Sequence, residues 1–588
     1  MSPKVFSFWS SPSAWPGTRM SSRLSSQRGA LVLGCALLTL SGTSILALLT
    51  PSAALASGTW GNAQEVPGTA TLNAGGNALI YGRTVSCPSS GNCSAGGHYT
   101  DSSHHQQAFV VNQNSGTWAT AQEVPGSAAL NAGGSAGLSA VSCASAGNCS
   151  AGGYYTDGSG AGQVFVVSET SGTWGDAQQL PVVGESTSGG FVEILSISCA
   201  SAGNCSAGGF YPDSSGLTQA FVATETNGTW SDGQAVPGVV ALNAGDSAQV
   251  TSVSCASAGD CSAGGSYTDS SGNQESFAAT ETNGTWGSGQ EISGTTAVPT
   301  GVGVSQMWMS CASVGNCSAG GYYTDSSNNV QAFVVNETSG TWGAAEEVPG
   351  TATLNAGGAA EVTSMSCASV GDCSAGGSYV DSSSNFQLFV VNETSGTWGT
   401  AEEVPGTATL NAGGNAGLNS LSCASAGNCS ASGAYRDSSG RTQAFVVDET
   451  SGTWAAAEEV PGTAALNIGG NAYALAVSCA PGGDCSAGGF YTDGSGHLQA
   501  FDATTAPSLA PTITSFSPTS GPVGKKVTIT GTNLSGATKV TFNGIAATIN
   551  SDTATQIVVH VPAGATTGKI KVKTPNGKGK SATNFTVT

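Results

Sequence analysis

Short apolar runs separated by turn residues recur along most of the chain. In residues 339–394, for example, runs of four to seven residues rich in Val, Phe, Tyr and Trp alternate with segments of Gly, Pro, Asn and Asp. Runs of this length, bounded by turn residues, predict β-strands, and four of them fall in this stretch. The pattern therefore predicts an all-β chain in which tight turns join short strands.

The tetrapeptide Ser/Asn-Gly-Thr-Trp marks a repeat of this four-strand unit. It begins at residues 57, 115, 171, 227, 283, 339, 395 and 451, so the first period is 58 residues and the later ones are 56. A repeat of this length with four strands per unit is typical of β-propeller blades. We therefore predict an eight-bladed β-propeller over residues 57–506.

The phase of the repeat also predicts how the ring closes. The first copy opens with a strand from Trp60 to Val66, whereas the last copy ends with a strand from Gln499 to Thr504. The last blade thus lacks an outer strand, and one is left over at the start. We expect these two strands to pair and to lock the first blade to the last.

Cysteine spacing follows the same repeat. Of 17 Cys, 16 occur as Cys-x5-Cys, once in each copy. An even, paired set in an exported chain indicates disulfides, and we expect each to bridge the turn between the first and second strands of a blade. The pairs are Cys87/Cys93, Cys143/Cys149, Cys199/Cys205, Cys255/Cys261, Cys311/Cys317, Cys367/Cys373, Cys423/Cys429 and Cys479/Cys485.

The amino-terminal residues 1–56 predict export. Residues 1–28 carry four basic residues and no acid, and an apolar run from Gly29 to Leu49 leads to Ala54-Leu55-Ala56. This order is typical of a secretory signal peptide, with cleavage after Ala56. An uncleaved membrane anchor is the alternative, because the apolar stretch is long enough to span a bilayer. Either way, we expect a secreted or cell-surface protein.

Composition changes after residues 507–510, which we interpret as a linker. Residues 511–588 lack Cys and Trp, and they alternate apolar and polar residues in short runs, which predicts a small β-sandwich. The motifs that begin at Ser517 (Ser-Pro-Thr-Ser-Gly-Pro), Gly531 (Gly-Thr-Asn-Leu) and Val540 (Val-Thr-Phe-Asn-Gly) closely resemble an IPT/TIG domain, an immunoglobulin-like module. The resemblance implies a spacer or a binding accessory and does not imply catalysis.

The repeats themselves also resemble a known group. The run Ser-Cys-Ala-Ser-Ala-Gly-Asn-Cys-Ser-Ala-Gly-Gly is similar to the cysteine-paired repeats of secreted bacterial propellers. The run Asn-Glu-Thr-Ser-Gly-Thr-Trp resembles a degenerate Asp-box, the hairpin before the last strand of sialidase-type blades. Glu337 and Glu393 stand where that motif has Asp. This likeness implies the fold and implies no activity.

Charge separates the two parts of the chain and limits their partners. Only 9 % of the residues are charged, yet residues 57–506 hold 35 acids and three arginines, a net charge of −32. A propeller this acidic repels nucleic acid, whose binding needs cations against phosphate. Residues 507–588 hold eight Lys and one acid, Asp552, so this basic sandwich is suited to contact an anionic cell envelope. A solvated lysine face is the alternative.

One Asp recurs in the predicted hairpin between the second and third strands of every copy. An Asx turn that caps the hairpin is the structural interpretation. Ca²⁺ binding by a rim of carboxylates is the functional one, although the dense Asp-x-Asp-x-Asp spacing of a calcium loop is missing. The residues are Asp101, Asp157, Asp213, Asp269, Asp325, Asp381, Asp437 and Asp493.

A ligand site is best sought where the copies differ. We expect the first strand of each blade to line the central channel, and the residues that lead into it vary between copies. Aromatic and amide side chains there suit sugar stacking and hydrogen bonds to hydroxyl groups, whereas drift between duplicated copies is the alternative. The candidate residues are Tyr81, Arg83, Glu193, Gln249, Trp308, Glu361, Asn419 and Tyr473.

These observations favour an exported binding or scaffold protein that recognises an extracellular glycan or protein and acts as a monomer without a cofactor, Ca²⁺ apart. No catalytic motif is evident, and three scattered arginines do not make a sialidase-type carboxylate clamp. A secreted glycoside hydrolase or lyase with a carboxylate pair on the loop face is the alternative, because such a pair would meet only in space. A surface-layer protein without a small ligand is a third possibility.

Overall fold

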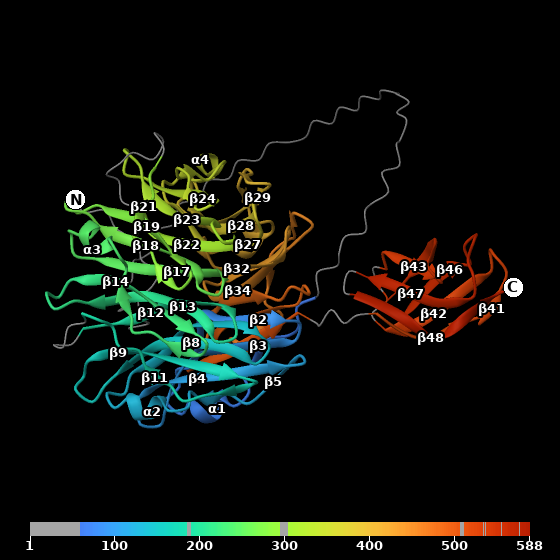
Figure 1. Cartoon of the computed structure of the whole chain (residues 1–588), viewed down its shortest axis with the longest axis horizontal. Helices are drawn as coiled ribbons and strands as arrows, with labels where there is room; N and C mark the ends of the chain where they lie inside the picture. Colours follow the sequence, from blue (N-terminus) through green and yellow to red (C-terminus); the bar gives the residue numbers. More distant parts are fainter. Residues whose placement is uncertain are drawn as a thin grey trace, which may run out of the picture. The chain divides into compact units, whose positions relative to one another are not determined.

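The computed structural model describes residues 59–184, 190–294, 304–505, 511–532, 534, 537–553, 555–574 and 577–588. The predicted signal peptide, its cleavage site and the linker 507–510 lie outside these residues. Eight sheets follow one another along residues 59–505, one for each Cys-x5-Cys copy, and they form the propeller predicted from the repeat (Figure 1).

Each sheet contains three long antiparallel strands. The inner strands are β2 (Leu79–Ser89), β7 (Ala136–Ser145), β12 (Glu193–Ser201), β17 (Ala248–Ser257), β22 (Val304–Ser313), β27 (Ala360–Ser369), β32 (Ala416–Ser425) and β37 (Ala472–Cys479). The second strands are β3 (Asn92–Thr100), β8 (Asn148–Thr156), β13 (Asn204–Pro212), β18 (Asp260–Thr268), β23 (Asn316–Thr324), β28 (Asp372–Val380), β33 (Asn428–Arg436) and β38 (Cys485–Thr492). The third strands are β4 (Gln106–Asn114), β9 (Gly162–Thr170), β14 (Thr218–Thr226), β19 (Gln274–Thr282), β24 (Val330–Thr338), β29 (Phe386–Thr394), β34 (Thr442–Thr450) and β39 (Leu498–Thr504).

The outer strand is broken into two short pieces that both pair with the third strand, which differs from the single strand expected. A few residues that leave the ladder separate the pieces. They are β5 (Thr117–Trp118) and β6 (Gln122–Glu123), β10 (Thr173–Trp174) and β11 (Gln178–Gln179), β15 (Thr229–Trp230) and β16 (Gln234–Ala235), β20 (Thr285–Trp286) and β21 (Gln290–Glu291), β25 (Thr341–Trp342) and β26 (Glu346–Glu347), β30 (Thr397–Trp398) and β31 (Glu402–Glu403), and β35 (Thr453–Trp454) and β36 (Glu458–Glu459).

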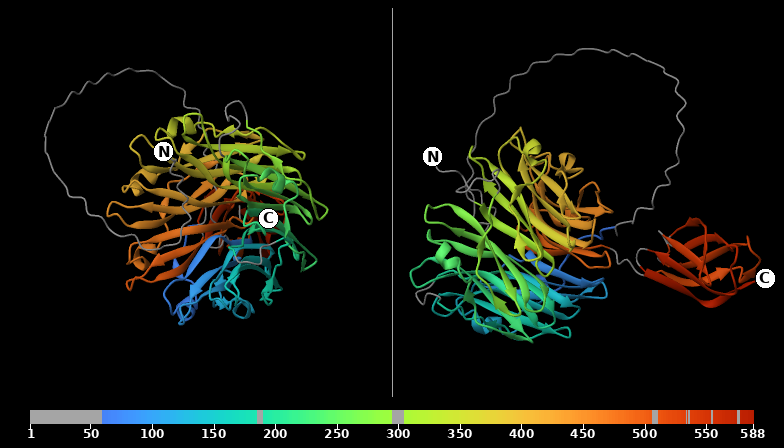
Figure 2. Two further views of the ribbon diagram at one scale, coloured as in Figure 1. Left: turned by 90° about the vertical axis from the view of Figure 1, so that its left-hand side faces the viewer. Right: turned by 45° about the horizontal axis from the view of Figure 1, so that its top comes forward.

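The ring closes as the repeat phase predicts. The strand β1 (Gln64–Glu65) pairs antiparallel with β39 of the last blade, and Trp60 forms a bridge with Thr505. The blue β2 sheet therefore lies beside the orange last blades in Figures 1 and 2. The amino-terminal strand supplies the outer edge of the eighth blade.

One type of hydrogen bond recurs between every two neighbouring blades. The backbone N–H of the first Cys in each blade donates to a Ser Oγ of the preceding blade over 2.9–3.1 Å, and Cys87 completes the circle by donating to Ser478 over 3.0 Å. All eight predicted disulfides are present, each between the inner and second strands of its blade. The chain-entropy contribution of such short loops is about 2–3 kcal/mol each.

The second Cys of each disulfide also makes a contact between blades that the sequence did not predict. Each is 3–5 % exposed, and its Sγ lies 3.2–3.5 Å from a Ser Oγ of the preceding blade. A disulfide sulfur carries no hydrogen, so it cannot donate in this contact. The disulfide therefore packs between blades as well as bridging a turn. The residues are Cys93, Cys149, Cys205, Cys261, Cys317, Cys373, Cys429 and Cys485.

The core lies between the sheets and repeats with them. One Phe on each third strand, from Phe109 to Phe501, is fully buried against the neighbouring blade. Each inner strand carries a bulge where it faces the Gly-Gly of Ser-Ala-Gly-Gly, or the Ser-Gly of the seventh blade. A Cβ added at Gly209 would lie 1.9 Å from the Glu193 carbonyl oxygen, so only glycine fits this close approach.

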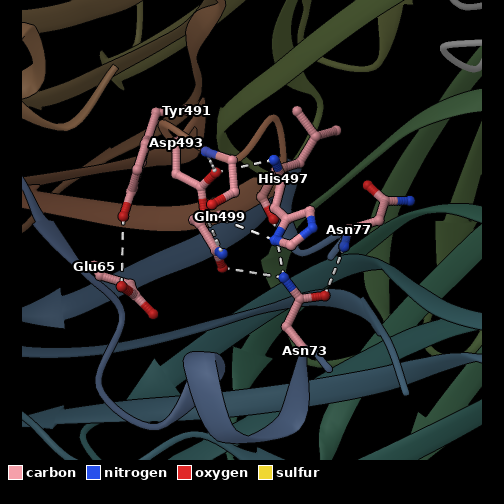
Figure 3. Close-up of polar contacts among 9 residues, drawn as sticks. Glu65, Asn73, Asn77, Tyr491, Asp493, His497 and Gln499 are labelled. Atoms are coloured by element: carbon pink, nitrogen blue, oxygen red, sulfur yellow. Dashed lines mark hydrogen bonds and ion pairs between the residues drawn. The ribbon is translucent and has the colours of Figure 1, made fainter. Parts of the chain in front are cut away.

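The loops that follow Val-Pro-Gly fold into a single helical turn in six blades, where the sequence predicted only a polar loop. The Asn after each turn donates its side-chain amide to the third strand of the preceding blade. Figure 3 shows this contact at the seam, where Asn73 donates to Gln499 Oε1 over 3.0 Å. The turns are α1 (Thr69–Leu72), α2 (Ser127–Leu130), α3 (Val239–Leu242), α4 (Thr351–Leu354), α5 (Thr407–Leu410) and α6 (Thr463–Leu466).

The Glu of the Asp-box-like motif lies buried between blades. Glu169, for example, accepts hydrogen bonds from Ser94 and Asn112 of the preceding blade, and burial raises the pKa of its carboxyl. Glu337 is also 3 % exposed, yet neither of its oxygens has a hydrogen-bond partner in the described part of the chain. This acid therefore belongs to the packing between blades.

Residues 511–588 form a β-sandwich, described by itself. Its two sheets enclose a core that includes Phe516, Phe542 and Phe585. One sheet has the order β40 (Thr512–Ser517), β42 (Lys526–Thr532), β46 (Gln556–His560), β45 (Ile549–Asp552). The other has the order β41 (Ser520–Gly521), β48 (Gly577–Val587), β47 (Gly568–Thr574), β43 (Lys539–Phe542), β44 (Ile545–Ala547).

Candidate functional site

The first blade differs from the others by two inserted residues, which explains its period of 58. Between the pairs Ile80–Gly97 and Val85–Ala95, four residues of β2 lie opposite one residue of β3, whereas in the second blade two residues lie opposite one. The inserted segment turns at Arg83, whose φ of 68° lies in the left-handed region, and the Thr84 hydroxyl donates to the Tyr81 carbonyl over 2.8 Å. The insertion thus builds a small loop on the inner strand of the first blade.

Arg83 reaches from this loop to three other inner strands. Its Nη1 donates to the carbonyl of Leu195 over 3.5 Å and to the carbonyl of Thr251. The guanidinium lies 4.0 Å from the ring centroid of Trp308, a cation–π contact. Burial lowers the pKa of Arg83 to about 9, and no carboxylate forms an ion pair with it among the described residues. Arg83 therefore ties blade 1 to blades 3, 4 and 5 across the channel.

Tyr81 begins a second group of side chains at the same loop. Its ring centroid lies 5.1 Å from that of His98, and the phenol of Tyr154 in the next blade is close enough to influence its pKa. Tyr154 also accepts a hydrogen bond from Gln106 Nε2 over 3.1 Å. Burial raises the pKa of both phenols, so they stay protonated and available as hydrogen-bond donors and acceptors.

Two phenylalanines extend this group into the third blade. The ring of Phe191 lies 5.7 Å from that of Tyr154 and 5.9 Å from that of Phe210, and Phe191 is 55 % exposed. The carboxylate of Glu193 lies beside them, where its charge adds to the effect of burial and raises the pKa of both Tyr81 and Tyr154. We name Tyr81, Tyr154, Phe191, Phe210 and Glu193 the aromatic cluster.

Glu193 is held at the edge of this cluster. The hydroxyl of Ser139, on the inner strand of the second blade, donates to Glu193 Oε1 over 2.8 Å. Burial is the main effect on the Glu193 carboxyl and raises its pKa, with the Ser139 hydrogen bond opposing it. The cluster therefore presents a partly buried hydrogen-bond acceptor next to exposed aromatic surface.

The other predicted ligand residues lie apart from the cluster. Asn419 donates its amide to the Ala474 carbonyl over 3.1 Å and so links two blades. Tyr473 stacks on Phe490 of its own blade, with ring centroids 5.2 Å apart. Gln249 is partly exposed on β17, and burial raises the pKa of the partly exposed Glu361 on β27 to about 7. Of the eight candidates, the structure thus pairs Tyr81 with Glu193 and Arg83 with Trp308.

Sequence reasoning missed the second-strand members of the cluster. Tyr154 and Phe210 occupy the position after Gly-Gly, which pairs directly with the varied position of the inner strand. That position also varies between copies, from Ser266 and Ser378 to Phe490. This variation was a usable signal, but recognising it requires the strand register.

The eight recurrent Asp residues cap their hairpins. In each, Oδ1 accepts the backbone N–H two residues later over 2.7–2.8 Å and the N–H four residues later over 2.8–3.1 Å. At Asp493 the other oxygen accepts from Gln499, which in turn meets Asn73 (Figure 3). At Asp101 desolvation acts to raise the pKa of the carboxyl, but the hydrogen bonds together outweigh it and the pKa is lowered.

These Asp residues occupy separate hairpins at the end of the ring where the Val-Pro-Gly loops also lie. Within the described ranges, no group of three or more His, Cys, Asp or Glu side chains is placed to hold a metal ion. The geometry is that of the Asx turn, and Ca²⁺ binding at the Asp rim stays a prediction.

The three sequence motifs of the sandwich lie at strand ends and in the turns between strands. The Ser517 motif leads from β40 through β41, and the Gly531 motif ends β42. A Cβ at Gly531 would lie 1.9 Å from the Thr512 carbonyl oxygen. The Val540 motif forms β43 and the hairpin to β44, with positive φ at Asn543 and Gly544. Residues 511–587 match the IPT/TIG domain family.

The IPT/TIG domain covers only the carboxy-terminal part, and no curated protein matches the chain. Among solved structures, a fungal alcohol oxidase of the AA5 family in complex with copper is 14 % identical at a TM-score of 0.36, covering 90 % of this chain and 100 % of that one. The Hadza microbial sialidase Hz136 is 10 % identical at a TM-score of 0.31, covering 58 % and 68 %. A subtype N11 neuraminidase-like protein of A/flat-faced bat/Peru/033/2010 (H18N11) is 12 % identical at a TM-score of 0.32, covering 62 % and 87 %. Likeness at these scores carries no information about chemistry.

Two features bear on the compartment. The eight disulfides fit an oxidising environment outside the cytoplasm. In the part of the chain that the structure describes, none of the helices has the length and the apolar character needed to cross a membrane.

Proposed function

We propose that this chain is an exported, non-catalytic binding protein whose propeller recognises an extracellular glycan through the aromatic cluster. The observation that supports the proposal most strongly is the 55 % exposed ring of Phe191, which two other rings hold in place. Among the exposed large apolar side chains of the described residues, Phe191 is the only aromatic one; the others are Val and Ile. An exposed aromatic face is suited to stacking on the C–H face of a sugar ring.

The polar groups around Phe191 complete a site of this kind. Ligand sites combine apolar surface with a few convergent polar groups that fix orientation. Here Glu193 offers an acceptor, and the phenols of Tyr81 and Tyr154 offer hydroxyls that donate and accept. Three neighbouring blades supply these groups, so the order of the ring sets their spacing.

Binding is tested with the full mature chain on a glycan array and then by calorimetry on the best ligand. We expect Phe191→Leu to weaken binding, because Leu keeps the apolar volume and loses the flat ring. Val370→Ala, a change at a 55 % exposed apolar residue in the sixth blade, is the matched control. Binding that is equal in wild type and Phe191→Leu would refute the site.

A mature amino terminus other than Ser57 on the exported protein would refute the predicted cleavage.

Calcium is tested in the same assay. The Asp Oδ1 atoms already accept two backbone N–H groups each, so we expect glycan binding to be unchanged by EDTA. Loss of binding on chelation, restored by Ca²⁺, would instead support the Asp rim as a cation site.

Glycan hydrolysis or lyase activity is the second candidate, and one observation favours it. Burial raises the pKa of Glu361 to about 7, which is the range of a general acid in glycosidases. Release of new reducing ends from a bound glycan, abolished in Glu361→Gln with binding intact, would support the enzyme. Binding without product release supports the non-catalytic proposal.

A further inference from the structure

The IPT/TIG domain carries lysines in adjacent rows on one face of a sheet. On β47, Lys571 and Lys573 are exposed, while Ile570 and Val572, which alternate with them, are buried in the core. Lys573 pairs with Lys539 of β43 on one side and with Lys578 of β48 on the other. Lys571 pairs with Lys580 in the next row.

Like charges directly opposite one another on neighbouring strands are destabilising. Edge protection does not explain the arrangement, because β47 lies inside the sheet, between β48 and β43. The single acid of the domain, Asp552, lies on β45 of the other sheet and accepts the Ala537 N–H. Among the described residues of the domain, no acidic side chain therefore compensates one face, which we name the lysine face. It is formed by Lys539, Lys571, Lys573, Lys578 and Lys580.

We infer that the lysine face is a docking surface for a linear anionic polymer of the cell envelope that carries a phosphate in each repeat. Adjacent strands lie about 4.8 Å apart and alternate residues along a strand about 6.7 Å apart, so the backbone positions that carry these lysines are spaced at the scale of such a repeat. All eight cations of residues 507–588 are Lys and none is Arg. Lysine ammonium groups are common phosphate binders and act as compact point charges.

The surface also argues against two other anions. Membrane surfaces are usually bound with apolar or aromatic side chains between the cations, and single-stranded nucleic acid with stacking aromatic rings. On the lysine face the position between cations is Thr541, which pairs with Lys571. This face lies on a different domain from the aromatic cluster, so the inference stands independently of the proposed glycan site.

The test uses the full chain and long-chain inorganic polyphosphate as the probe, with binding measured over a series of salt concentrations. We expect the triple variant Lys571→Gln/Lys573→Gln/Lys580→Gln to bind about tenfold or more weakly near 50 mM salt. Its slope of log K against log salt should be shallower by about two. The double variant Lys525→Gln/Lys526→Gln, which removes charge at the start of β42, is the matched control and should change binding much less.

Further arms decide the class of the anion. The corresponding triple Lys→Arg variant should retain binding, because it keeps the charges. A thermal melt of each variant verifies the fold, and removal of opposed like charges should leave the melting point equal or higher. Equal binding by wild type and the Gln triple variant would overturn the inference. So would tighter binding to phosphatidylglycerol vesicles, single-stranded DNA or polygalacturonate than to polyphosphate at matched charge concentration.

Discussion

The side chain of Gln64 donates a hydrogen bond to Asp502 Oδ2 over 3.4 Å, and this contact lies on the seam between the first and last blades. Asp502 is 2 % exposed, and its Oδ1 has no hydrogen-bond partner among the described residues. Burial raises the pKa of its carboxyl to about 7. The other blades have Val or Ala at this register, as at Val446. The closing blade thus holds an acid where the repeat otherwise holds an apolar residue.

Replacing this acid is expected to stabilise the ring. Asp502→Val should raise the unfolding free energy by about 1–3 kcal/mol at pH 8, because it removes an incompletely paired buried carboxylate. At pH 5 the gain should be smaller, since Asp502 is protonated there in the folded state. Thermal unfolding followed by circular dichroism at both pH values measures the difference. The reverse change Val446→Asp is the control and should destabilise at pH 8; an Asp502→Val variant that melts lower than wild type at pH 8 would contradict the prediction.

The stability of the whole propeller should also fall as the pH rises from 5 to 8. The pKa values of Glu169, Glu225, Glu281 and Glu393 are all raised by burial between blades. For an acid with a raised folded pKa, the stabilisation is complete below the unfolded pKa and is lost as the pH rises through the folded pKa. The propeller should therefore melt higher near pH 5 than near pH 8.

The hairpin Asp residues should limit the stability of the propeller at low pH. Their folded pKa values are lowered, to about 2 for Asp437, so their contribution is lost as the pH falls through the folded value. Melting temperatures measured from pH 3 to pH 9 should pass through a maximum on the acidic side of neutrality. A melting temperature that rises steadily from pH 5 to pH 9 would show that the buried carboxyls do not dominate.

Two equivalent acids should respond oppositely to the same substitution. Glu337 is buried without hydrogen-bond partners among the described residues, whereas Glu393 accepts from Ser318 and Asn336 of the preceding blade. Glu337→Met should stabilise the protein at pH 8, because it removes a desolvated carboxylate that gains nothing in return. Glu393→Met should destabilise it by about 1–3 kcal/mol, because the buried Ser318 hydroxyl and the half-buried Asn336 amide lose their acceptor. Chemical unfolding of both variants measures the contrast, and a shift of the same sign in both would contradict the interpretation.

The repeat made most of this fold predictable. Spacing alone determined the number of blades, the disulfide pairs and the closing strand, because each depends only on the order of copies along the chain. The roles of single residues were harder to predict. Glu393 finds its partners 57 and 75 positions earlier in the sequence, in a neighbouring blade. Asn419 had the amide expected of a sugar ligand, yet that amide holds a backbone carbonyl. Cys373 was predicted as a disulfide partner, yet its contact with Ser318 of the preceding blade was not. Such roles depend on contacts between blades, which the pattern within one repeat does not contain.

The contact between Arg83 and Trp308 should give a measurable coupling energy between the two side chains. The two-residue insertion in the first blade brings a cation 4.0 Å from the ring of an inner strand in the fifth blade. A cation over an indole contributes about 0.5–2 kcal/mol, with the larger values for desolvated cations, and burial lowers the pKa of Arg83 to about 9. A double-mutant cycle with Arg83→Met and Trp308→Leu isolates this coupling from the two carbonyl hydrogen bonds, which only the Arg83 change removes. We expect a coupling energy of about 1 kcal/mol at pH 7. A coupling near zero would mean that the two carbonyls alone hold the guanidinium across the channel.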